Sequence, residues 1–220
     1  YDISGICIAA NEVGGDFFDY FWFDEKQGKF GIVLGDVSGK AMKAAMTAVM
    51  ASGMISAEIA DGSSISEVLR KANRILFPKT DREIFTAVCL CALDTRRKRF
   101  TFANAGLNKP LLKSRKGVTS LEAVGSTHPL GILRESKHRE RVVQLHPGDV
   151  IVLQTDGIVE AQDRDRNQYG EERLNGLLEA LDTRLHSARS IRDTIVRDVQ
   201  RFSASAPQHD DMALVVIKVL

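Results

Sequence analysis

The pattern of hydrophobic and polar positions predicts that most of the chain folds into β-strands. Short apolar runs are separated by turn residues, which is typical of strands joined by tight connections. Strands are predicted at residues 3–10, 17–23, 30–37, 84–93, 99–103, 110–113, 142–145, 150–154 and 212–219.

Four longer segments predict α-helices. Residues 40–59 are rich in Ala and Met and contain no Pro, which favours a helix whose small residues let backbones pack closely. Ser64 and Glu67 form a capping-box sequence, after which apolar residues fall on one face of a helix that ends before Pro78. Two further helices are predicted at residues 173–181 and 190–202.

The order of these elements indicates the fold class. Strands are followed by two helices, many strands, two more helices and one last strand, so the regular alternation of a doubly wound parallel fold is missing. We therefore predict an α+β fold in which antiparallel sheets carry helix pairs on their outside. We see no repeat, low-complexity stretch or linker, so we predict one domain over residues 1–220.

Composition and charge exclude several classes of protein. The 30 Lys and Arg nearly balance the 29 Asp and Glu, and a net charge of +1 argues against a nucleic-acid partner. No run of apolar residues is long enough for a transmembrane helix, so no direct membrane insertion is predicted. Three Cys exclude a disulfide framework; Cys89 and Cys91 are interpreted as buried thiols in a reducing cytoplasm. The chain begins inside a predicted strand, so we expect an upstream region in a longer protein.

Aspartates at the ends of predicted strands are the candidates for chemistry. Each stands beside a glycine or another polar residue. They are Asp16, Asp36, Asp156, Asp210 and Asp211, with Gly15 and Gly157 as neighbours. Capping a turn is the alternative role for each of them. If they meet in space, their repulsion requires cations, and all-oxygen ligands select Mg²⁺ or Mn²⁺ over Zn²⁺. Two such ions, bridged by one carboxylate, activate a water and neutralise a phosphoryl group.

Other phosphate-binding signals are weaker. The glycine-rich segment 35–40 is not a P-loop, because its spacing fails at Leu34 and Ala41 stands where a Ser or Thr would bind the metal. Ser38 and Lys40 are predicted to lie near an anion at the N-terminus of the following helix. The alternative role of Ser38 is a helix N-cap, and that of Lys40 is a solvated surface charge.

Five motifs together resemble a known family. Residues 12–19 (EVGGDFFD), 35–40 (GDVSGK), 104–106 (NAG), 155–161 (TDGIVEA) and 209–216 (HDDMALVV) occur in that order. Their order and spacing resemble the bacterial SpoIIE/RsbU-type branch of the PPM (PP2C-like) metal-dependent Ser/Thr protein phosphatases, over essentially the whole chain. The resemblance implies a four-layer αββα sandwich, with two central and mostly antiparallel sheets flanked by helix pairs. It also implies a centre of two Mn²⁺ or Mg²⁺ ions.

The resemblance implies a role for each of the aspartates. Asp36 corresponds to the ligand that bridges both metals. Asp16, directly or through water, and the backbone carbonyl of Val37 correspond to ligands of the second metal. Asp156 and Asp210 correspond to ligands of the first. Catalysis by Asp36 and Asp156 would act through the metal-bound water. The neighbouring Asp211 is also acidic, so it is easily mistaken for Asp210 in this match.

Several positions depart from the family pattern. Ala41 replaces the last Gly of a Gly-Lys-Gly sequence, and Leu107 replaces a His after Asn-Ala-Gly. The phosphate-binding Arg and general-acid His of eukaryotic members have no counterpart, and Asn11 and Ser38 stand near those positions. His209 is next to Asp210 in the sequence, and on that ground alone it is a candidate to protonate the leaving group. The alternative is that His209 is simply a residue of a turn.

The leading hypothesis is a metal-dependent phosphatase that hydrolyses phosphoserine or phosphothreonine on a protein by direct attack of water, without a covalent phosphoenzyme. The resemblance implies a phosphorylated STAS-type anti-sigma antagonist as substrate, in partner switching that regulates sigma factors in stress responses. An upstream sensor or regulatory domain, a cytoplasmic location and a homodimer are further expectations. A non-catalytic regulatory module of the same fold and a phosphatase of small molecules are the alternatives.

The first two predicted helices, residues 40–77, are also predicted to act as a switch. The small and flexible residues of the first helix motivate this hypothesis, in which helix orientation sets whether Asp16 and Asp36 hold the second ion. The alternative is a tightly packed core helix with no switching.

Overall fold

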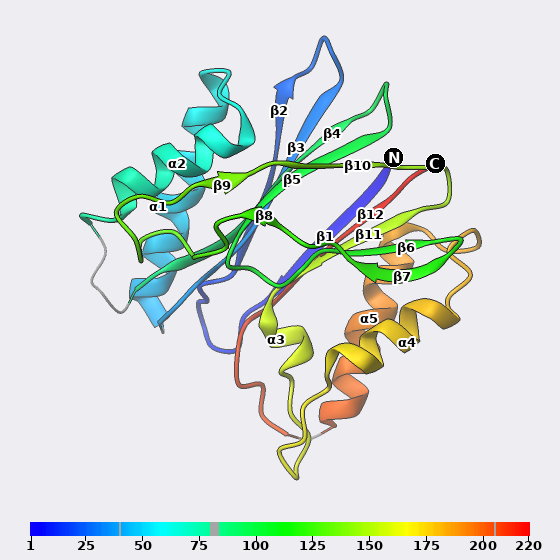
Figure 1. Ribbon diagram of the computed structural model, residues 1–220. Helices are drawn as coiled ribbons and strands as arrows, with labels where there is room; N and C mark the ends of the chain where they lie inside the picture. Colours follow the sequence, from blue (N-terminus) through cyan, green and yellow to red (C-terminus); the bar gives the residue numbers. More distant parts are fainter. Residues whose placement is uncertain (40, 80–83, 205) are drawn as a thin grey trace. The chain divides into compact units, whose positions relative to one another are not determined.

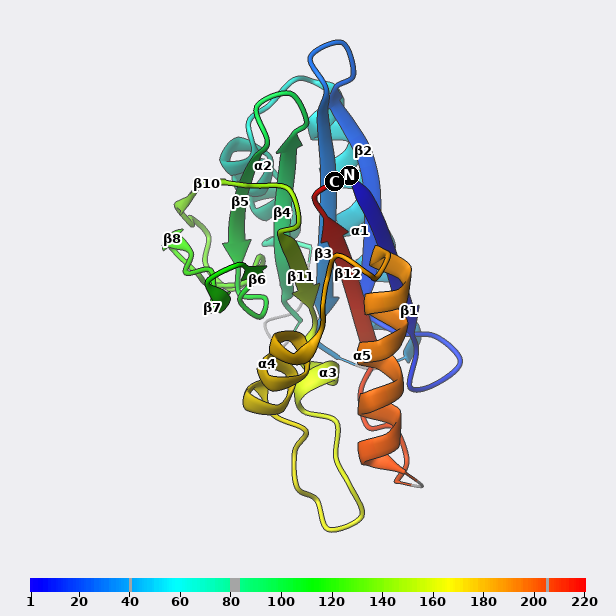
Figure 2. The same cartoon turned by 90° about the vertical axis from the view of Figure 1, so that its right-hand side faces the viewer.

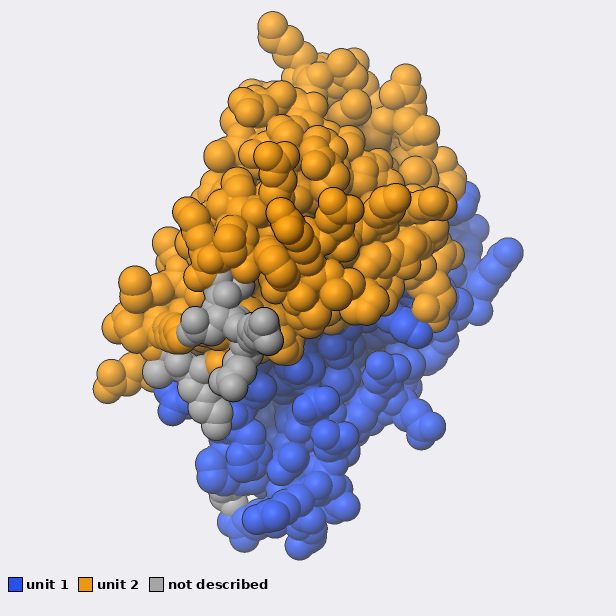
Figure 3. Space-filling view, turned by 60° about the vertical axis from the view of Figure 1, so that its left-hand side comes forward, with its two compact units in different colours: residues 1–11, 108–121, 146–220 blue, residues 12–107, 122–145 orange. Residues whose placement is uncertain are grey.

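The computed structural model describes residues 1–39, 41–79, 84–204 and 206–220 (Figure 1). These residues form two compact units, each assembled from separate stretches of the chain (Figure 3). The first unit holds Tyr1–Asn11, Asn108–Leu121 and His146–Leu220; the second holds Glu12–Leu107 and Glu122–Leu145. Each unit contains one five-stranded sheet and its own helices. The prediction of a single domain over residues 1–220 stays a prediction.

The sheet of the second unit is antiparallel at every strand pair. Its order is β10 (Arg141–Gln144), β5 (Arg99–Ala105), β4 (Thr86–Asp94), β3 (Lys29–Val37) and β2 (Phe17–Asp24). The central strand β4 is buried at nearly every position, whereas the edge strand β2 is partly exposed. A short ribbon of β8 (Val124–Gly125) and β9 (His138–Arg139) belongs to the same unit.

Helices α1 (Ala41–Ala60) and α2 (Ile65–Leu76) cover one face of this sheet (Figures 1 and 2). The buried face of α2 carries the apolar positions at helical spacing, and these side chains form one core with residues of β3, β4 and β5. Ser64 caps α2 by accepting a hydrogen bond from the backbone N–H of Glu67 (3.4 Å). The Glu67 carboxylate pairs with Arg70 instead of reaching back, so only half of the predicted capping box forms.

The sheet of the first unit is also antiparallel. Its order is β1 (Asp2–Ile8), β12 (Met212–Lys218), β11 (Val150–Gln154), β6 (Leu111–Ser114) and β7 (Gly117–Ser120). Because β12 pairs with β1 along its whole length, the two ends of the chain lie side by side (Figure 1).

Three helices belong to the first unit: α3 (Asp156–Val159), α4 (Glu171–Ala180) and α5 (Ala188–Ser203). Helix α5 packs on β1 and β12, and its apolar face closes a core with the inward side chains of β11 and β12. Helix α3 is a single turn that directly follows β11 and contacts β12. This short turn places the residue after β11 at the start of a helix.

The strands and helices predicted from the sequence are present, with ends that shift by a few residues. Lys40, the first residue of the predicted helix 40–59, lies outside the described residues. The pattern did not predict β7, β8, β9 or α3. The α+β class with antiparallel sheets is confirmed.

Two findings bear on the predictions made from composition. Cys89 and Cys91 are fully buried in β4 with their sulfur atoms 3.6 Å apart, and burial raises the pKa of the Cys91 thiol, so both act as core residues. Within the described ranges, no helix combines the length and the hydropathy that crossing a membrane requires.

Candidate metal centre

Asp16 and Asp36 lie at adjoining strand ends in the second unit. The register of β2 and β3 pairs Phe17 with Gly35, so Asp16 and Asp36 are the next pair of positions along the two strands. The backbone N–H of Val37 donates a hydrogen bond to the carbonyl of Gly15 (3.3 Å), which extends the pairing past the end of β2. Both aspartates are partly buried.

Gly15 makes this close approach feasible. A β-carbon at position 15 would lie 2.5 Å from the carbonyl oxygen of Val37 and 3.2 Å from the Cβ of Ala44 on α1. A side chain would therefore push the Gly15–Asp16 turn away from β3. The carbonyl of Val37, which the resemblance implies as a ligand, lies next to the turn that carries Asp16.

Alternation along β3 points Asp36 away from the helices. Val33 and Val37 pack into the cores that α1 and α2 form, so their neighbours in the alternation face the other side of the sheet. That side carries Asp36 together with the fully buried Ile32 and Leu34. The Asp36 carboxylate thus sits at the end of an apolar row.

Ser38, after Asp36, and Asn104, near the end of β5, hold the backbone through hydrogen bonds. Ser38 accepts a hydrogen bond through its hydroxyl from the N–H of Phe85 (2.8 Å) and donates its own N–H to the Phe85 carbonyl (2.9 Å). Asn104 closes a turn with Leu107, donating to its carbonyl (2.9 Å) and accepting from its N–H (2.8 Å). Leu107 is buried, so the departure at this position fits the fold. The predicted anion contacts of Ser38 and Lys40 stay predictions, and Lys40 is not among the described residues.

Asp156 begins α3 in the first unit, directly after β11. Thr155 fixes this point: its N–H donates to the carbonyl of Ala213 (3.0 Å), and its hydroxyl accepts from the Ala213 N–H (2.8 Å). Gly157 allows the next close approach, because a β-carbon there would collide with the carbonyl oxygen of Asp211. The start of α3 and the residues before β12 are therefore held together.

The adjacent acids Asp210 and Asp211 differ in their contacts. One carboxylate oxygen of Asp211 accepts a hydrogen bond from the N–H of Ala10 (2.8 Å). Asp210 is exposed, and one of its carboxylate oxygens accepts the N–H of Asp211 (2.8 Å). The amide of Gln208 donates to the carbonyls of Asp210 (2.8 Å) and Ile8 (2.9 Å). Asp211 therefore anchors the segment after β1, whereas Asp210 presents its carboxylate at the surface.

Electrostatics indicate that the first-unit carboxylates are crowded. Burial raises the pKa of Asp156 above its ordinary value, and the negative charges of Asp210 and Glu160 raise it further. The sequence reasoning did not single out Glu160, although it stands four residues after Asp156, a spacing that brings helical side chains together. His209, the candidate proton donor, is exposed in the loop before β12.

The donors fit a hard divalent cation. The four predicted aspartates are divided two and two between the units, and each pair offers only oxygen ligands. Burial, and after it the charges of Asp210 and Glu160, raise the pKa of Asp156, and a bound cation would favour its ionised form. Within the described part of the chain, no three His, Cys, Asp or Glu gather into a metal-binding group. The predicted ligand set therefore stays a prediction.

Solved structures define the class of this fold. The SiaA-PP2C domain of Pseudomonas aeruginosa matches it with a TM-score of 0.84 and 21% identity, over 99% of this chain and 86% of that one. RsbX, solved in complex with magnesium, matches it with a TM-score of 0.69 and 12% identity, over 98% and 94% of the two chains. At these identities the likeness shows the fold alone, which is that of PP2C-type phosphatases.

The family follows from the sequence comparison. The chain belongs to the stage II sporulation protein E (SpoIIE) family, whose model matches residues 26–220. Phosphoserine phosphatase RsbU of Bacillus subtilis (strain 168) is 28% identical over 99% of this chain and 63% of RsbU. The chain thus spans less than two thirds of the length of that relative. The predicted family is confirmed, and the name of the relative supports the predicted enzyme class, a protein Ser/Thr phosphatase.

Proposed function

We propose that this chain is the catalytic domain of a metal-dependent phosphatase that hydrolyses phosphoserine or phosphothreonine on a protein. One observation carries the proposal: aspartates lie at strand ends in both units. In each unit a glycine beside an aspartate leaves room for a backbone carbonyl of the neighbouring segment. Membership of the SpoIIE family and the name of RsbU support the reaction.

Five groups are proposed to hold two Mn²⁺ or Mg²⁺ ions. Asp36 would bridge them, Asp16 and the Val37 carbonyl would bind one, and Asp156 and Asp210 would bind the other. When bound, such ions supply a water nucleophile at neutral pH and offset the charge of a phosphoryl group. The magnesium complex of RsbX supports this choice of cation.

Asp211 is assigned a positioning role in this proposal, because the Ala10 amide already occupies one of its oxygens. Gly15 and Gly157 serve the site through the close backbone contacts that they permit. His209 stays a candidate for protonating the leaving group, since its exposed ring lies in the loop that carries Asp210.

The proposed substrate is a phosphorylated STAS-type anti-sigma antagonist, acting in a partner-switching pathway that controls sigma factors. The resemblance carried by the five motifs implies this choice, and the proposal includes an upstream sensor or regulatory domain in a longer protein. A cytoplasmic location and a homodimer complete the proposal.

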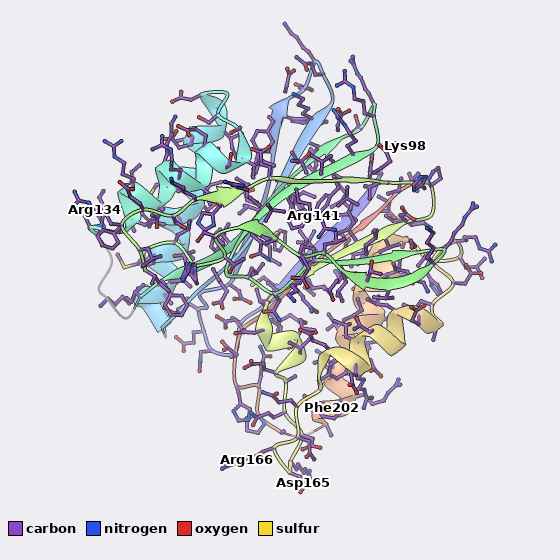
Figure 4. All side chains as sticks on the ribbon, viewed as in Figure 1. Lys98, Arg134, Arg141, Asp165, Arg166 and Phe202 are labelled. Carbon is purple, nitrogen blue, oxygen red and sulfur yellow. The ribbon has the colours of Figure 1, made fainter. Side chains whose placement is uncertain are left out.

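Phosphate release from nitrophenyl phosphate and from a phosphoserine peptide tests the reaction. We expect activity with Mn²⁺ that EDTA abolishes. Changes to groups around a bound metal cost about 10–100-fold, so Asp36→Asn and Asp156→Asn, which alter direct ligands, should lower kcat by at least about 100-fold. The matched control is Asp165→Asn, at the exposed tip of the loop after α3 (Figure 4), which should keep full activity.

Three outcomes would contradict the proposal. Full activity in excess EDTA or in Asp36→Asn would exclude metal-dependent hydrolysis at this site. Folded wild-type protein that binds no Mn²⁺ in a calorimetric titration would instead favour the non-catalytic module. Hydrolysis of sugar phosphates or nucleotides as fast as phosphopeptides would favour the small-molecule phosphatase.

A further inference from the structure

A cavity of about 240 Å³ lies in the first unit beside Asp210. Three segments form its walls: the stretch from Gly157 in α3 to Gln162, the last turn of α5, and the loop of residues 206–212 that leads into β12. All three belong to the same unit. The proposed function assigns no role to this cavity.

The lining of the cavity is mixed, with buried apolar side chains beside polar ones such as Gln162, Gln200 and Gln208. Val199 and Met212 are only 1% and 6% exposed, and Ala161 and Pro207 add further apolar surface. None of the described residues that line it is Lys or Arg, so it lacks the cations that bind a phosphate group. The acidic Glu160 and Asp210 at the same cavity disfavour an acidic occupant.

The α5 wall is held in place by packing and hydrogen bonds. Phe202, in the last turn of α5 (Figure 4), packs edge-on against Tyr169 with ring centroids 5.6 Å apart. The guanidinium of Arg173 lies 5.0 Å from the Phe202 ring centroid, and the Tyr169 hydroxyl donates to Asp198 of α5 (2.8 Å). These contacts fix α5 to α4 and to the segment that precedes it, so this wall is preformed.

The position of the cavity connects it to the proposed substrate. Gly157 and Asp210 both line it; one follows the proposed ligand Asp156, and the other is itself a proposed ligand. A peptide whose phosphoserine reaches these carboxylates must place its neighbouring residues nearby, because successive residues span only about 3.3–3.6 Å each.

We propose that this cavity binds an apolar side chain of the phosphoprotein substrate, within about three residues of the phosphoserine. This inference rests on the proposed phosphatase function and names a determinant of its specificity. The volume of about 240 Å³ is below the roughly 300–1,000 Å³ of sites that enclose a whole small molecule. It suits a side chain such as Leu or Met, with Val199 and Met212 as the apolar base.

A set of phosphoserine peptides with an alanine background tests the proposal. A single Leu is moved through the three positions on either side of the phosphoserine. With Mn²⁺, the wild-type protein should show a kcat/KM about 10-fold higher for Leu at one position, which is the scale of discrimination by a hydrophobic pocket. The corresponding Asp peptide should not show this gain.

Variants that fill the cavity should remove that preference. Ser203 and the exposed Gln200 line the cavity, so Ser203→Phe and Gln200→Phe should each abolish the Leu gain through KM. Their hydrolysis of nitrophenyl phosphate, which has no flanking residues, should match wild type. Arg201→Phe is the matched control, because Arg201 shares the last turn of α5 but does not line the cavity.

A crosslinking measurement gives a readout apart from turnover. The preferred peptide carrying photo-leucine should crosslink to residues 199–204 or 206–212 in wild type and lose that crosslink in Ser203→Phe. Equal kcat/KM for all peptides, or a Leu preference that survives both filling variants, would overturn the inference while leaving the phosphatase function intact. Failure of wild type to hydrolyse nitrophenyl phosphate with Mn²⁺ would contradict the proposed function, and this inference with it.

Discussion

Gly15 and Gly157 each stand beside a proposed ligand, and each leaves room for a carbonyl oxygen of a neighbouring segment. The glycine-aspartate pairing is visible in the sequence and predicts that Asp16, Asp36 and Asp156 lie at strand ends. The contacts that distinguish Asp210 from Asp211 were not predictable. The hydrogen bond from Ala10 to Asp211 joins residues 201 positions apart, and no local pattern reports such a contact.

A prediction at this scale concerns Asp198. The hydrogen bond from Arg173 lowers the pKa of Asp198 below its usual range, and the Tyr169 hydroxyl adds to the effect. A lowered pKa in the folded state stabilises the fold above the unfolded-state pKa, and this stability is lost as the pH falls through the folded-state value. Asp198→Asn should therefore lower the free energy of unfolding at pH 7 by about 1.5–3 kcal/mol.

Urea denaturation at neutral and acid pH measures this effect. The gap between wild type and Asp198→Asn should shrink below about pH 4, where the carboxyl of the unfolded chain is protonated. Asp165→Asn, at an exposed loop tip, should leave stability unchanged at both pH values. A gap that is the same at neutral and acid pH would show that the charge of Asp198 contributes nothing.

At the scale of elements, periodicity predicted the long segments and missed the short ones. Helix α2 was predicted because its apolar positions repeat at helical spacing and Ser64 caps it. Strand β7 reads Gly-Val-Thr-Ser, which is too short and polar to show a strand period. Helix α3 spans only four residues, and the side chain of Thr155 does not cap it. The Asp-Gly sequence at its start therefore indicated a turn and not a helix.

Helix α1 has an exposed apolar stripe on the face away from its sheet. Met42, Met46 and Val49 are 62%, 66% and 75% exposed and follow helical spacing, whereas Ala44 and Ala48 are buried. Ala44 and Ala48, two of the small residues that motivated the switch hypothesis, are thus packed in the core. That α1 and α2 act as a switch stays a prediction.

A prediction at this scale concerns the attachment of α2 to residues 131–134. The buried Asn73 side chain donates to the carbonyl of Leu133 (2.9 Å) and accepts from the N–H of Gly131 (2.8 Å). Asn73→Ala should lower the free energy of unfolding by about 1–3 kcal/mol, because these backbone groups lose their partner. Thermal unfolding of the variant and of its exposed neighbour Arg74→Ala tests this, and equal losses would contradict it.

At the scale of the whole molecule, each unit is built from stretches that are far apart in the sequence, and each carries two of the four proposed aspartate ligands. The order of strands and helices predicted the fold class, because antiparallel pairing and helix pairs follow from local patterns. The assembly of the ligand set did not follow from those patterns. The proposed ligand set rests instead on the order of the five motifs, which identified the family that the comparison confirms.

The most direct test of this account is diffraction at the manganese absorption edge from crystals grown with Mn²⁺. We predict anomalous peaks bound by Asp36, with Asp16 and the Val37 carbonyl on one ion and with Asp156 and Asp210 on the other. Crystals in which manganese is absent from all four carboxylates, at a concentration that supports phosphate release, would contradict the account.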